Sequence, residues 1–275
     1  MYLIAEIGIN HNGDINIAKK LLDAAHACGW HCGKFQKRNP DVCVPEEQKT
    51  VMRSTPWGEM TYLDYKKRVE FNDAEYDVID QYCKLKPMHW TASPWDHDSL
   101  NFLLKYDVPF LKIASASLTD HSLIKECALS GKPVILSTGM STIDEIDEAV
   151  TILDRHSAGN FMLMHTNSAY PAPINELNLK VIPFLKERYD CLVGYSGHEK
   201  GLEPTVVAVA LGASFVERHI TLDHQMWGTD HAASLEVHAM DMLRKRIEGV
   251  PLMLGDGIKT VTETETAVRK KLRNS

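Results

Sequence analysis

The stretch Gly194-Tyr-Ser-Gly-His198 ends a short apolar run, and Val216-Glu-Arg-His219 ends a second one. Between them lies the segment 205–211, whose apolar residues have helical spacing. A strand, a helix and a second strand in this order favour a parallel pair joined by a crossover helix. Because parallel strands end at the same edge of a sheet, we expect His198 and His219 to lie close together.

The same strand–helix unit recurs along the whole chain. Apolar runs of four to six residues alternate with longer amphipathic segments eight times, which predicts an α/β protein with a single (β/α)8 TIM barrel. A doubly wound open sheet is the alternative, but it usually has fewer strands and a Gly-rich turn after the first strand. The expected strands are 3–7, 32–36, 89–92, 110–113, 134–137, 161–165, 191–195 and 214–217, and the expected helices are 15–27, 74–85, 99–106, 123–129, 143–155, 176–188, 205–211 and 238–247.

Two helix starts have recognisable signals. Asn72-Asp73 precedes one helix, and Ser141-Thr-Ile-Asp144 has the form of a capping box with Asp in the Glu/Gln place. The segment 39–70 has no clear apolar period and is interrupted by several prolines. We interpret it as a long loop, either a lid over the mouth of the barrel or a disordered surface excursion. The barrel is expected to span residues 1–265, and the basic segment 266–275 is expected to fray as a solvated tail.

Composition limits the classes of function. The 275 residues include 44% hydrophobic and 24% charged residues with a net charge of −7, which is typical of a globular protein and argues against a nucleic-acid partner. There is no long apolar run and no leader-like N-terminus, so we expect no membrane span and a cytoplasmic location. The six scattered cysteines favour reduced thiols, although Cys28, His31 and Cys32 could also hold a metal.

The expected strand ends are strongly polar, and in a barrel such side chains converge on one mouth. Lys34 and Lys112 stand inside apolar runs, and a buried lysine needs an opposite charge. With the neighbouring hydroxyls they predict a site for a phosphate, a carboxylate or a molecule that carries both. Two alternatives remain open: structural ion pairs with Glu6 and another carboxylate, or a Schiff-base lysine of an aldolase.

A metal site is expected at the same mouth. His198 and His219 supply imidazoles, and Ser196, Glu217 and Asp230 supply oxygens nearby. Imidazole combined with oxygen suits a divalent ion such as Mn²⁺ or Zn²⁺ with open positions for a substrate.

Together these motifs resemble the sialic acid synthase family, and the resemblance extends from residue 3 to about residue 265. Enzymes of that family condense phosphoenolpyruvate with an N-acylated hexosamine such as N-acetylmannosamine, which gives a nonulosonic acid and phosphate. The motifs are Glu6-Ile-Gly-Ile-Asn-His-Asn-Gly13, Lys34-Phe-Gln36, Lys112-Ile-Ala-Ser115, Leu136-Ser-Thr-Gly-Met140, Tyr170-Pro, Tyr195-Ser-Gly-His198, Glu217-Arg-His219 and Gly228-Thr-Asp230.

The resemblance implies roles for individual residues. It makes His198 and His219 the metal ligands, with Mn²⁺ the usual ion and Mg²⁺ or Co²⁺ possible, and it gives catalytic roles to Glu6, Glu217 and Lys112. The positions that match phosphoenolpyruvate binding are Lys34, Lys112, Ser115, Ser137, Ser168, Tyr170 and Ser196; those that match contacts with the sugar, its aldehyde or the attacking water are Glu6, Gln36, Glu217 and Asp230.

The sequence departs from the family pattern in three places. Ser117 and Gly197 stand where family members commonly have acidic residues, and the expected barrel is not followed by the family's antifreeze-like domain, which lends an Arg to the partner's sugar site. Three alternatives stay open: Arg38 or Arg53 replaces that Arg, the substrate lacks the feature that the Arg recognises, or a separate protein supplies it. The identity of the sugar therefore stays open, with legionaminic or pseudaminic acid synthases as close alternatives and a non-catalytic scaffold as a distant one. A homodimer is the expected assembly.

Overall fold

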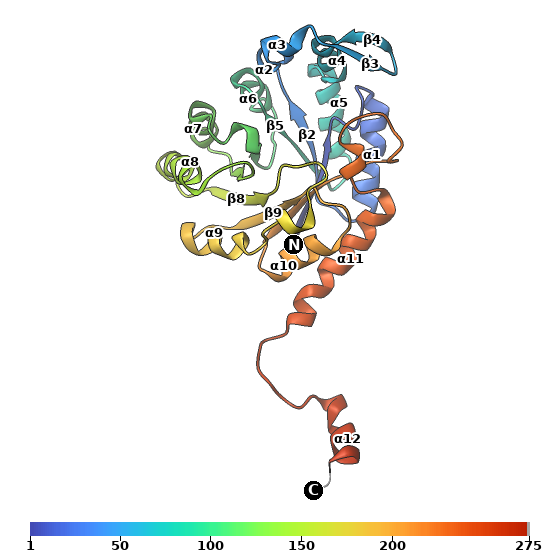
Figure 1. Cartoon of the computed structure of the whole chain (residues 1–275), viewed down its shortest axis with the longest axis vertical. Coiled ribbons are helices and arrows are strands. Elements are labelled where there is room, and N and C mark those ends of the chain that lie inside the picture. Colours follow the sequence, from blue (N-terminus) through green and yellow to red (C-terminus); the bar gives the residue numbers. More distant parts are fainter. Residues whose placement is uncertain (274–275) are drawn as a thin grey trace.

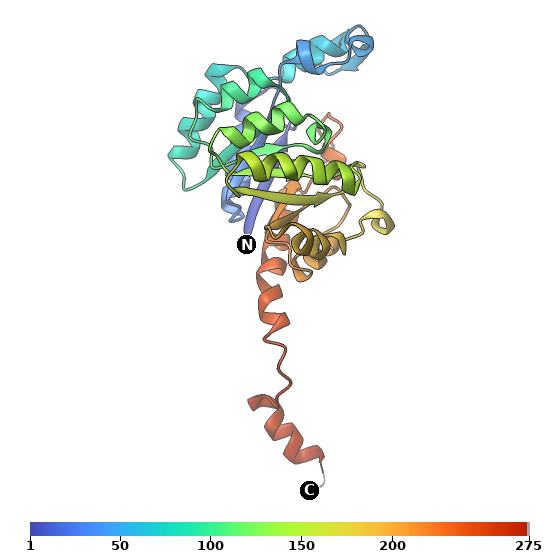
Figure 2. The same cartoon turned by 90° about the vertical axis from the view of Figure 1, so that its left-hand side faces the viewer.

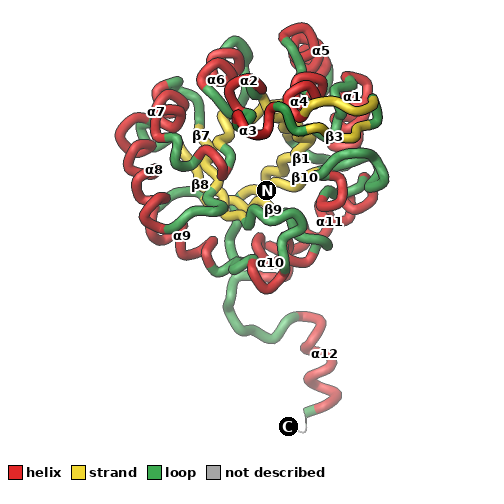
Figure 3. The backbone as a smooth tube through the Cα atoms, turned by 45° about the horizontal axis from the view of Figure 1, so that its top comes forward, coloured by secondary structure: helices red, strands yellow, loops and turns green. Residues whose placement is uncertain are grey.

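The computed structural model describes residues 1–273 and shows a ring of eight parallel strands surrounded by helices (Figures 1 and 3). Neighbouring strands follow the order β5-β2-β1-β10-β9-β8-β7-β6, so the first and last strands of the chain pair and the sheet curls on itself. The predicted TIM barrel is confirmed. Its strands are β1 Tyr2–Gly8, β2 Cys32–Lys37, β5 His89–Pro94, β6 Leu111–Ile113, β7 Val134–Ser137, β8 Phe161–Thr166, β9 Val193–Gly197 and β10 Phe215–His219.

The seam between β5 and β6 differs from the rest of the ring. Within residues 1–273 these two strands share no backbone ladder, and each pairs with a single neighbour. The buried Thr91 hydroxyl of β5 instead donates to the carbonyl of Phe110, just before β6, at 2.7 Å. A side chain therefore joins the two edges of the sheet.

Helices pack on the outside of the ring through apolar stripes. In α8, Ile146, Ala149, Val150 and Leu153 are buried, and their spacing of three and four residues places them on one helical face. Burying one such large side chain contributes roughly 1.5–3 kcal/mol. The outer helices are α1 Ile15–Ala27, α5 Asp73–Lys84, α6 His97–Leu103, α7 His121–Leu129, α8 Ile143–His156, α9 Val181–Tyr189, α10 Glu203–Ala210 and α11 Val237–Leu254, with short 3₁₀ turns η1 Ser115–Ser117, η2 Ile174–Glu176 and η3 His231–Ala233.

The two predicted helix starts had different outcomes. Asn72 caps α5 in a full capping box with Glu75, as expected from the Asn72-Asp73 signal. The box predicted at Ser141 and Asp144 is wrong by one residue, because Thr142 is the cap and Glu145 reaches back to the Thr142 amide at 2.7 Å. The sequence allows two overlapping capping boxes, Ser141 with Asp144 and Thr142 with Glu145. The second one forms, because a capping box uses the longer side chain of Glu or Gln at its third helical position.

The segment 39–70 is not an unstructured loop. It stands out from the barrel at one side of the mouth (Figure 2) and is built of short elements. The ring centroids of Trp57 and Tyr65 lie 5.7 and 5.2 Å from that of Trp227, so this segment contacts the loop after β10. Its elements are α2 Pro40–Cys43, α3 Glu46–Lys49, β3 Met52–Thr55, β4 Gly58–Thr61 and α4 Tyr62–Val69.

The chain leaves the barrel earlier than the predicted residue 265. Helix α11 ends at Leu254, residues 251–273 are all exposed, and helix α12 Glu263–Leu272 lies away from the barrel (Figures 1 and 2). The predicted frayed tail is therefore helical up to Leu272, with Thr262 and Glu265 in a capping box. Residues 274–275 of that tail lie outside the described part.

Residues 1–273 contain neither a membrane-spanning helix nor a disulfide. Among residues 1–273, no helix combines the length and the apolar character needed to cross a bilayer. All six cysteines are free thiols. Cys28, His31 and Cys32 do not form a cluster of metal-type ligands in the described chain.

Candidate active site

A cavity of roughly 660 Å³ opens at the carboxyl ends of the strands. Every site residue predicted from the sequence lines it except Asp230. The predicted residues in its wall are Glu6, Lys34, Gln36, Lys112, Ser115, Ser137, Ser168, Tyr170, Ser196, His198, Glu217 and His219, and the wall also includes Ser93, Trp95, Ala114, Ala116, Met140 and Thr166.

Two lysines and two glutamates form a buried charge network at the base of the cavity. Lys34 Nζ lies 2.5 Å from Glu6 Oε2 and 3.4 Å from Glu217 Oε1, and Lys112 Nζ lies 3.6 Å from Glu217 Oε2. Burial lowers the pKa of Lys112, whereas for Lys34 the carboxylates of Glu217 and Glu6 outweigh burial and raise the pKa. The structural ion pairs considered as an alternative are thus present, within a cavity wall.

Hydroxyl groups lie beside both ammonium groups. Lys112 Nζ donates to Ser137 Oγ at 2.7 Å, and Lys34 Nζ donates to Ser93 Oγ at 3.2 Å. Charged donors and neutral hydroxyls that point into one space suit the oxygens of a phosphate or carboxylate.

Gly139, after β7, completes this side of the cavity. Its amide donates to Ser115 Oγ at 3.1 Å. A Cβ at this position would lie 2.3 Å from Ser168 Oγ and 2.8 Å from Ser115 Oγ. Glycine therefore lets the backbone approach the two serines closely.

The two histidines face one another across Tyr170 on the other side of the cavity. The Tyr170 hydroxyl lies 2.9 Å from His198 Nε2 and 3.5 Å from His219 Nε2. His198 Nδ1–H donates to the Asn167 carbonyl at 2.7 Å, which leaves its Nε2 with a free lone pair. Burial, assisted by His219, lowers the pKa of His198 to about 3. The two imidazoles thus point their Nε2 atoms toward one place, as a ligand pair requires.

Asp230 lies outside the cavity wall. It precedes η3, and its carboxylate accepts from the Thr229 hydroxyl at 2.7 Å. Burial raises the pKa of Tyr170, and the negative charge of Asp230 adds to the effect. Asp230 is therefore close enough to act on the histidine side of the site through its charge.

A chain of polar contacts leads from the base of the cavity to its rim. Gln36 Nε2 donates to Glu6 Oε1 at 3.2 Å, and Gln36 Oε1 accepts from Arg38 Nη2. The Arg38 guanidinium lies 4.4 Å from the centroid of the Trp95 ring, which lines the cavity.

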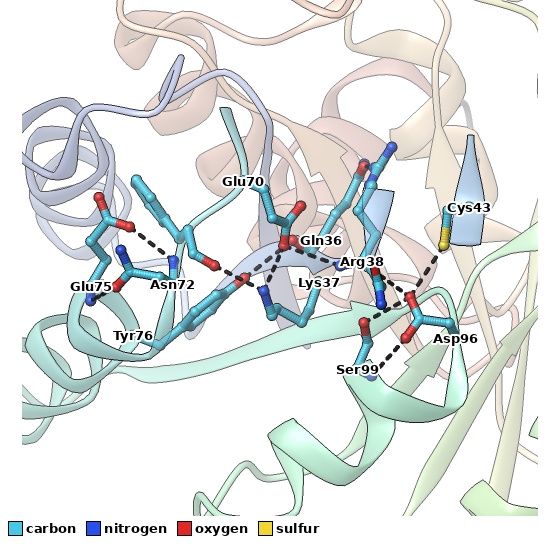
Figure 4. Close-up of polar contacts among 12 residues, drawn as sticks. Gln36, Lys37, Arg38, Cys43, Glu70, Asn72, Glu75, Tyr76, Asp96 and Ser99 are labelled. Atoms are coloured by element: carbon cyan, nitrogen blue, oxygen red, sulfur yellow. Dashed lines mark hydrogen bonds and ion pairs between the residues drawn. The ribbon is translucent and has the colours of Figure 1, made fainter. Parts of the chain in front are cut away.

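The carboxylates of Glu70 and Asp96 bind the backbone of Arg38 and Asn39, just after β2 (Figure 4). Glu70 Oε1 accepts from Lys37 Nζ at 2.9 Å and from the Arg38 amide at 3.1 Å. Asp96 accepts from the Asn39 amide at 2.6 Å. The start of the segment 39–70 is thus fixed to the barrel next to the cavity.

Thr166 and Trp95 are among the lining residues that were not predicted from the sequence. His165 ends the apolar run 161–165, so its strand-end position would place it at the mouth, but its ring bonds the Leu177 carbonyl at 2.8 Å and does not line the cavity. Thr166, the last residue of β8, and Ser168 beyond it line the cavity instead. Thr166 could have been predicted from Ser168, because residues two apart in an extended chain point to the same side. Trp95 follows the last residue of β5. A large aromatic residue directly after a barrel strand could have been predicted to line the mouth.

A second buried ion pair supports β10 from the helix side. The side chains of Arg218 and Glu199 are both 0% exposed, with Arg218 Nη1 3.0 Å from Glu199 Oε1. Arg218 also donates to the Glu199 carbonyl at 2.7 Å. A Cβ on Gly197 would lie 2.7 Å from Glu199 Oε2 and 2.9 Å from Arg218 Cδ, so this pair explains a glycine beside His198.

Comparisons with known proteins agree with the geometry. The NeuB family profile matches residues 21–259. N,N'-diacetyllegionaminic acid synthase of Campylobacter jejuni is 36% identical over 98% of this chain and 83% of its own length, and human N-acetylneuraminate-9-phosphate synthase is 35% identical over 100% and 77%. The crystal structure of N-acetylneuraminic acid synthetase from Leptospira borgpetersenii superposes with a TM-score of 0.87 at 32% identity, covering 100% of this chain and 93% of the other. The chain therefore belongs to the NeuB family and is an enzyme of the sialic acid synthase type.

Proposed function

We propose that this enzyme condenses phosphoenolpyruvate with an N-acylated hexosamine, N-acetylmannosamine or a relative, and releases phosphate to give a nonulosonic acid. One observation carries the proposal. A single cavity holds lysine and serine donors on one side and a pair of imidazoles on the other. Such a cavity can bind an anionic enol phosphate beside an aldehyde.

The residues fit the steps of the reaction. Lys34, Lys112 and the serines at 115, 137 and 196 would hold the phosphate and carboxylate of phosphoenolpyruvate with preorganised donors. C3 of phosphoenolpyruvate attacks the aldehyde carbon of the open-chain sugar, and water adds at the electron-poor C2. The tetrahedral intermediate then loses phosphate by C–O cleavage and leaves the 2-keto acid. Glu6 or Glu217 would accept the proton of the water, and a proton delivered to the former aldehyde oxygen gives the new hydroxyl.

Metal dependence is part of the proposal. His198 and His219 would hold a divalent ion, Mn²⁺ with Mg²⁺ or Co²⁺ as alternatives. The arrangement supports this because both Nε2 atoms face the Tyr170 hydroxyl, and the Asn167 carbonyl sets the tautomer of His198. When bound, such an ion supplies a Lewis acid for the aldehyde oxygen. The described residues provide no third His, Cys, Asp or Glu ligand, so water and substrate oxygens would complete the set.

The test is phosphate release from phosphoenolpyruvate with a panel of N-acylated hexosamines and Mn²⁺. We expect release that depends on one sugar, is lost with EDTA and falls by more than about a hundredfold in His219→Ala. His121→Ala, at an exposed histidine on α7, is the matched control and should retain activity. Release that continues in EDTA would remove the metal from the proposal, and no release with any sugar would refute the condensation.

Two alternatives are distinguished by related measurements. Including 2,4-diacetamido sugars in the panel separates a legionaminic or pseudaminic acid synthase from a neuraminic acid synthase. The lowered pKa of the buried Lys112 also suits a Schiff-base aldolase. Borohydride trapping with pyruvate tests that alternative, and we expect no covalent adduct.

Location and assembly complete the proposal. We infer a cytoplasmic enzyme, since phosphoenolpyruvate is a cytoplasmic metabolite, and we infer pairing of two copies. The exposed apolar side chains of the C-terminal segment support association, among them Leu252, Ile258 and Leu272. Sedimentation velocity of the whole chain tests the assembly.

A further inference from the structure

The turn Asn10-His11-Asn12-Gly13 follows β1, and none of its four residues lines the cavity. In the ring, β1 lies between β2 and β10. The turn therefore lies between the segment 39–70, which follows β2, and the loop 221–234, which follows β10 and includes η3. All three leave the barrel at the carboxyl ends of their strands, where the cavity opens.

Asn10 holds the base of the loop after β10. Its side chain is 1% exposed, and its Nδ2 donates to the Ile220 carbonyl at 2.8 Å and to Ser234 Oγ at 2.9 Å, so one amide group joins the two ends of the loop. The Ser234 hydroxyl in turn donates to the Asp230 carbonyl at 2.7 Å. Ile220 follows the cavity residue His219 directly, so the same bonds fix the backbone beside that imidazole.

Asn12 holds the tip of the same loop, because its Nδ2 donates to the Trp227 carbonyl at 2.9 Å. The Trp227 ring meets Trp57 and Tyr65 of the segment 39–70 edge-on, with interplanar angles of 73° and 89°. The φ of Asn12 is 52°, in the left-handed region that asparagine adopts more readily than most residues. The amide of Asn12 thus reaches the loop from a conformation that few other side chains allow.

His11 and Gly13 lie against the end of the segment 39–70. The buried His11 ring stacks on Phe71, with the two centroids 3.9 Å apart. A Cβ on Gly13 would lie 2.5 Å from the carbonyl oxygen of Arg68 in α4, so glycine allows the turn to approach this helix closely. Each residue of the turn therefore packs on one of its two neighbours in the ring.

We propose that the turn 10–13 is the positioning element for the sugar side of the site. Asn10 and Asn12 fix the loop 221–234, and through it the segment 39–70, so that both cover the mouth in the arrangement that the sugar requires. This inference rests on the proposed function. Within residues 1–273 neither asparagine bonds a lysine or serine of the cavity, so the binding of phosphoenolpyruvate should not depend on them.

The experiment measures KM for the sugar and for phosphoenolpyruvate in Asn12→Asp. Asp also tolerates a positive φ, but its ionised carboxylate only accepts hydrogen bonds and would face the Trp227 carbonyl. We expect KM for the sugar to rise by about five- to tenfold, with kcat and KM for phosphoenolpyruvate within about twofold of the wild type. Ser234→Ala, which removes a bond of Asn10 without changing the turn, should raise the same KM.

The matched control is Asn178→Asp, because Asn178 is an exposed asparagine with a φ of 43° that does not line the cavity. This variant should keep both KM values. Equal rises in KM for both substrates in Asn12→Asp would overturn the positioning role.

Hydrogen exchange followed by mass spectrometry separates this inference from the proposed function, because it needs no turnover. In Asn12→Asp the amides of 222–230 and of 51–66 should both exchange faster, since Trp227 joins the two regions, whereas those of α8 should not change. If no sugar is converted, faster exchange in both regions still supports positioning by the turn, and only the condensation fails. Unchanged exchange in 51–66, or faster exchange throughout the barrel, overturns the inference.

Discussion

At the scale of single residues, the ion pair of Arg218 and Glu199 sets the position of β10. Arg218 stands between Glu217 and His219 but points to the helix side, so it fixes the strand that carries both site residues. Glu199→Gln would leave the guanidinium without its opposite charge in a fully buried place. We expect this change to lower the free energy of unfolding by about 3–5 kcal/mol, measured by urea denaturation.

The control for this change is a surface pair of similar chemistry. Arg244 and Glu248 lie 2.6 Å apart at i,i+4 spacing on α11, with Glu248 exposed. Glu248→Gln should cost less than about 1 kcal/mol. Equal losses from Glu199→Gln and Glu248→Gln would contradict the structural importance of the buried pair.

How well the site could be predicted also depends on single residues. Lys34, Lys112 and the two histidines were predictable because polar residues at the ends of apolar runs must face a barrel mouth. Thr166 was not, because the apolar run that predicted its strand ended at His165, one residue before it. Asp230 was placed in the site by its position after His219 and by resemblance, but it is not among the residues that line the cavity.

At the scale of elements, Asp96 joins α6 to the segment 39–70. It accepts from the Ser99 amide at 2.8 Å as the cap of α6 and from the Asn39 amide at 2.6 Å (Figure 4). Asn has one acceptor oxygen in place of two and would turn its NH₂ toward one of these N–H groups. Asp96→Asn should therefore lower stability at pH 7 by about 2 kcal/mol.

The pH dependence of this change has a definite sign. Burial would raise the pKa of Asp96, but the Asn39 and Ser99 amides outweigh it and hold the pKa below its ordinary value of 3.8. A lowered pKa in the folded state gives stability that is present above pH 3.8 and is lost as the pH falls through the folded pKa. Thermal melts should show the Asp96→Asn deficit constant from pH 7 to pH 5 and shrinking below about pH 4. The exposed Asp98→Asn serves as control, and a deficit that grows in acid would contradict the assignment.

The lengths of the elements explain why the sequence predicts the strands and helices of the barrel better than the segment 39–70. The apolar run at 191–195 predicted a strand, but Leu192 is 54% exposed and β9 begins at Val193, so hydrophobic character alone placed the boundary two residues early. In the segment 39–70, helices α2 and α3 are four residues long. A period of 3.6 residues cannot be recognised in one turn, so only the contacts with Trp227 and the barrel define this region.

At the scale of the whole molecule, the C-terminal segment is separate from the barrel core. Residues 251–273 are all exposed, whereas Val250 and Ile247 of α11 are buried. A chain ending at Gly255 should keep its melting temperature within about 2 °C, because it loses little buried surface. A chain ending at Arg246 should melt at least about 5 °C lower, because it loses two buried side chains. A large drop for the first truncation would show that the segment 256–273 packs against something, such as a second copy.

The seam between β5 and β6 gives the barrel the form of a split ring. Lys34 on β2 and Lys112 on β6 lie on opposite sides of that split, and Glu217 contacts both from β10. Sliding the split open breaks no backbone ladder in the described chain, and the Thr91 hydroxyl bond that resists it is worth only about 1 kcal/mol. The two ammonium groups thus flank the junction of the described ring that a side-chain hydrogen bond closes in place of a backbone ladder.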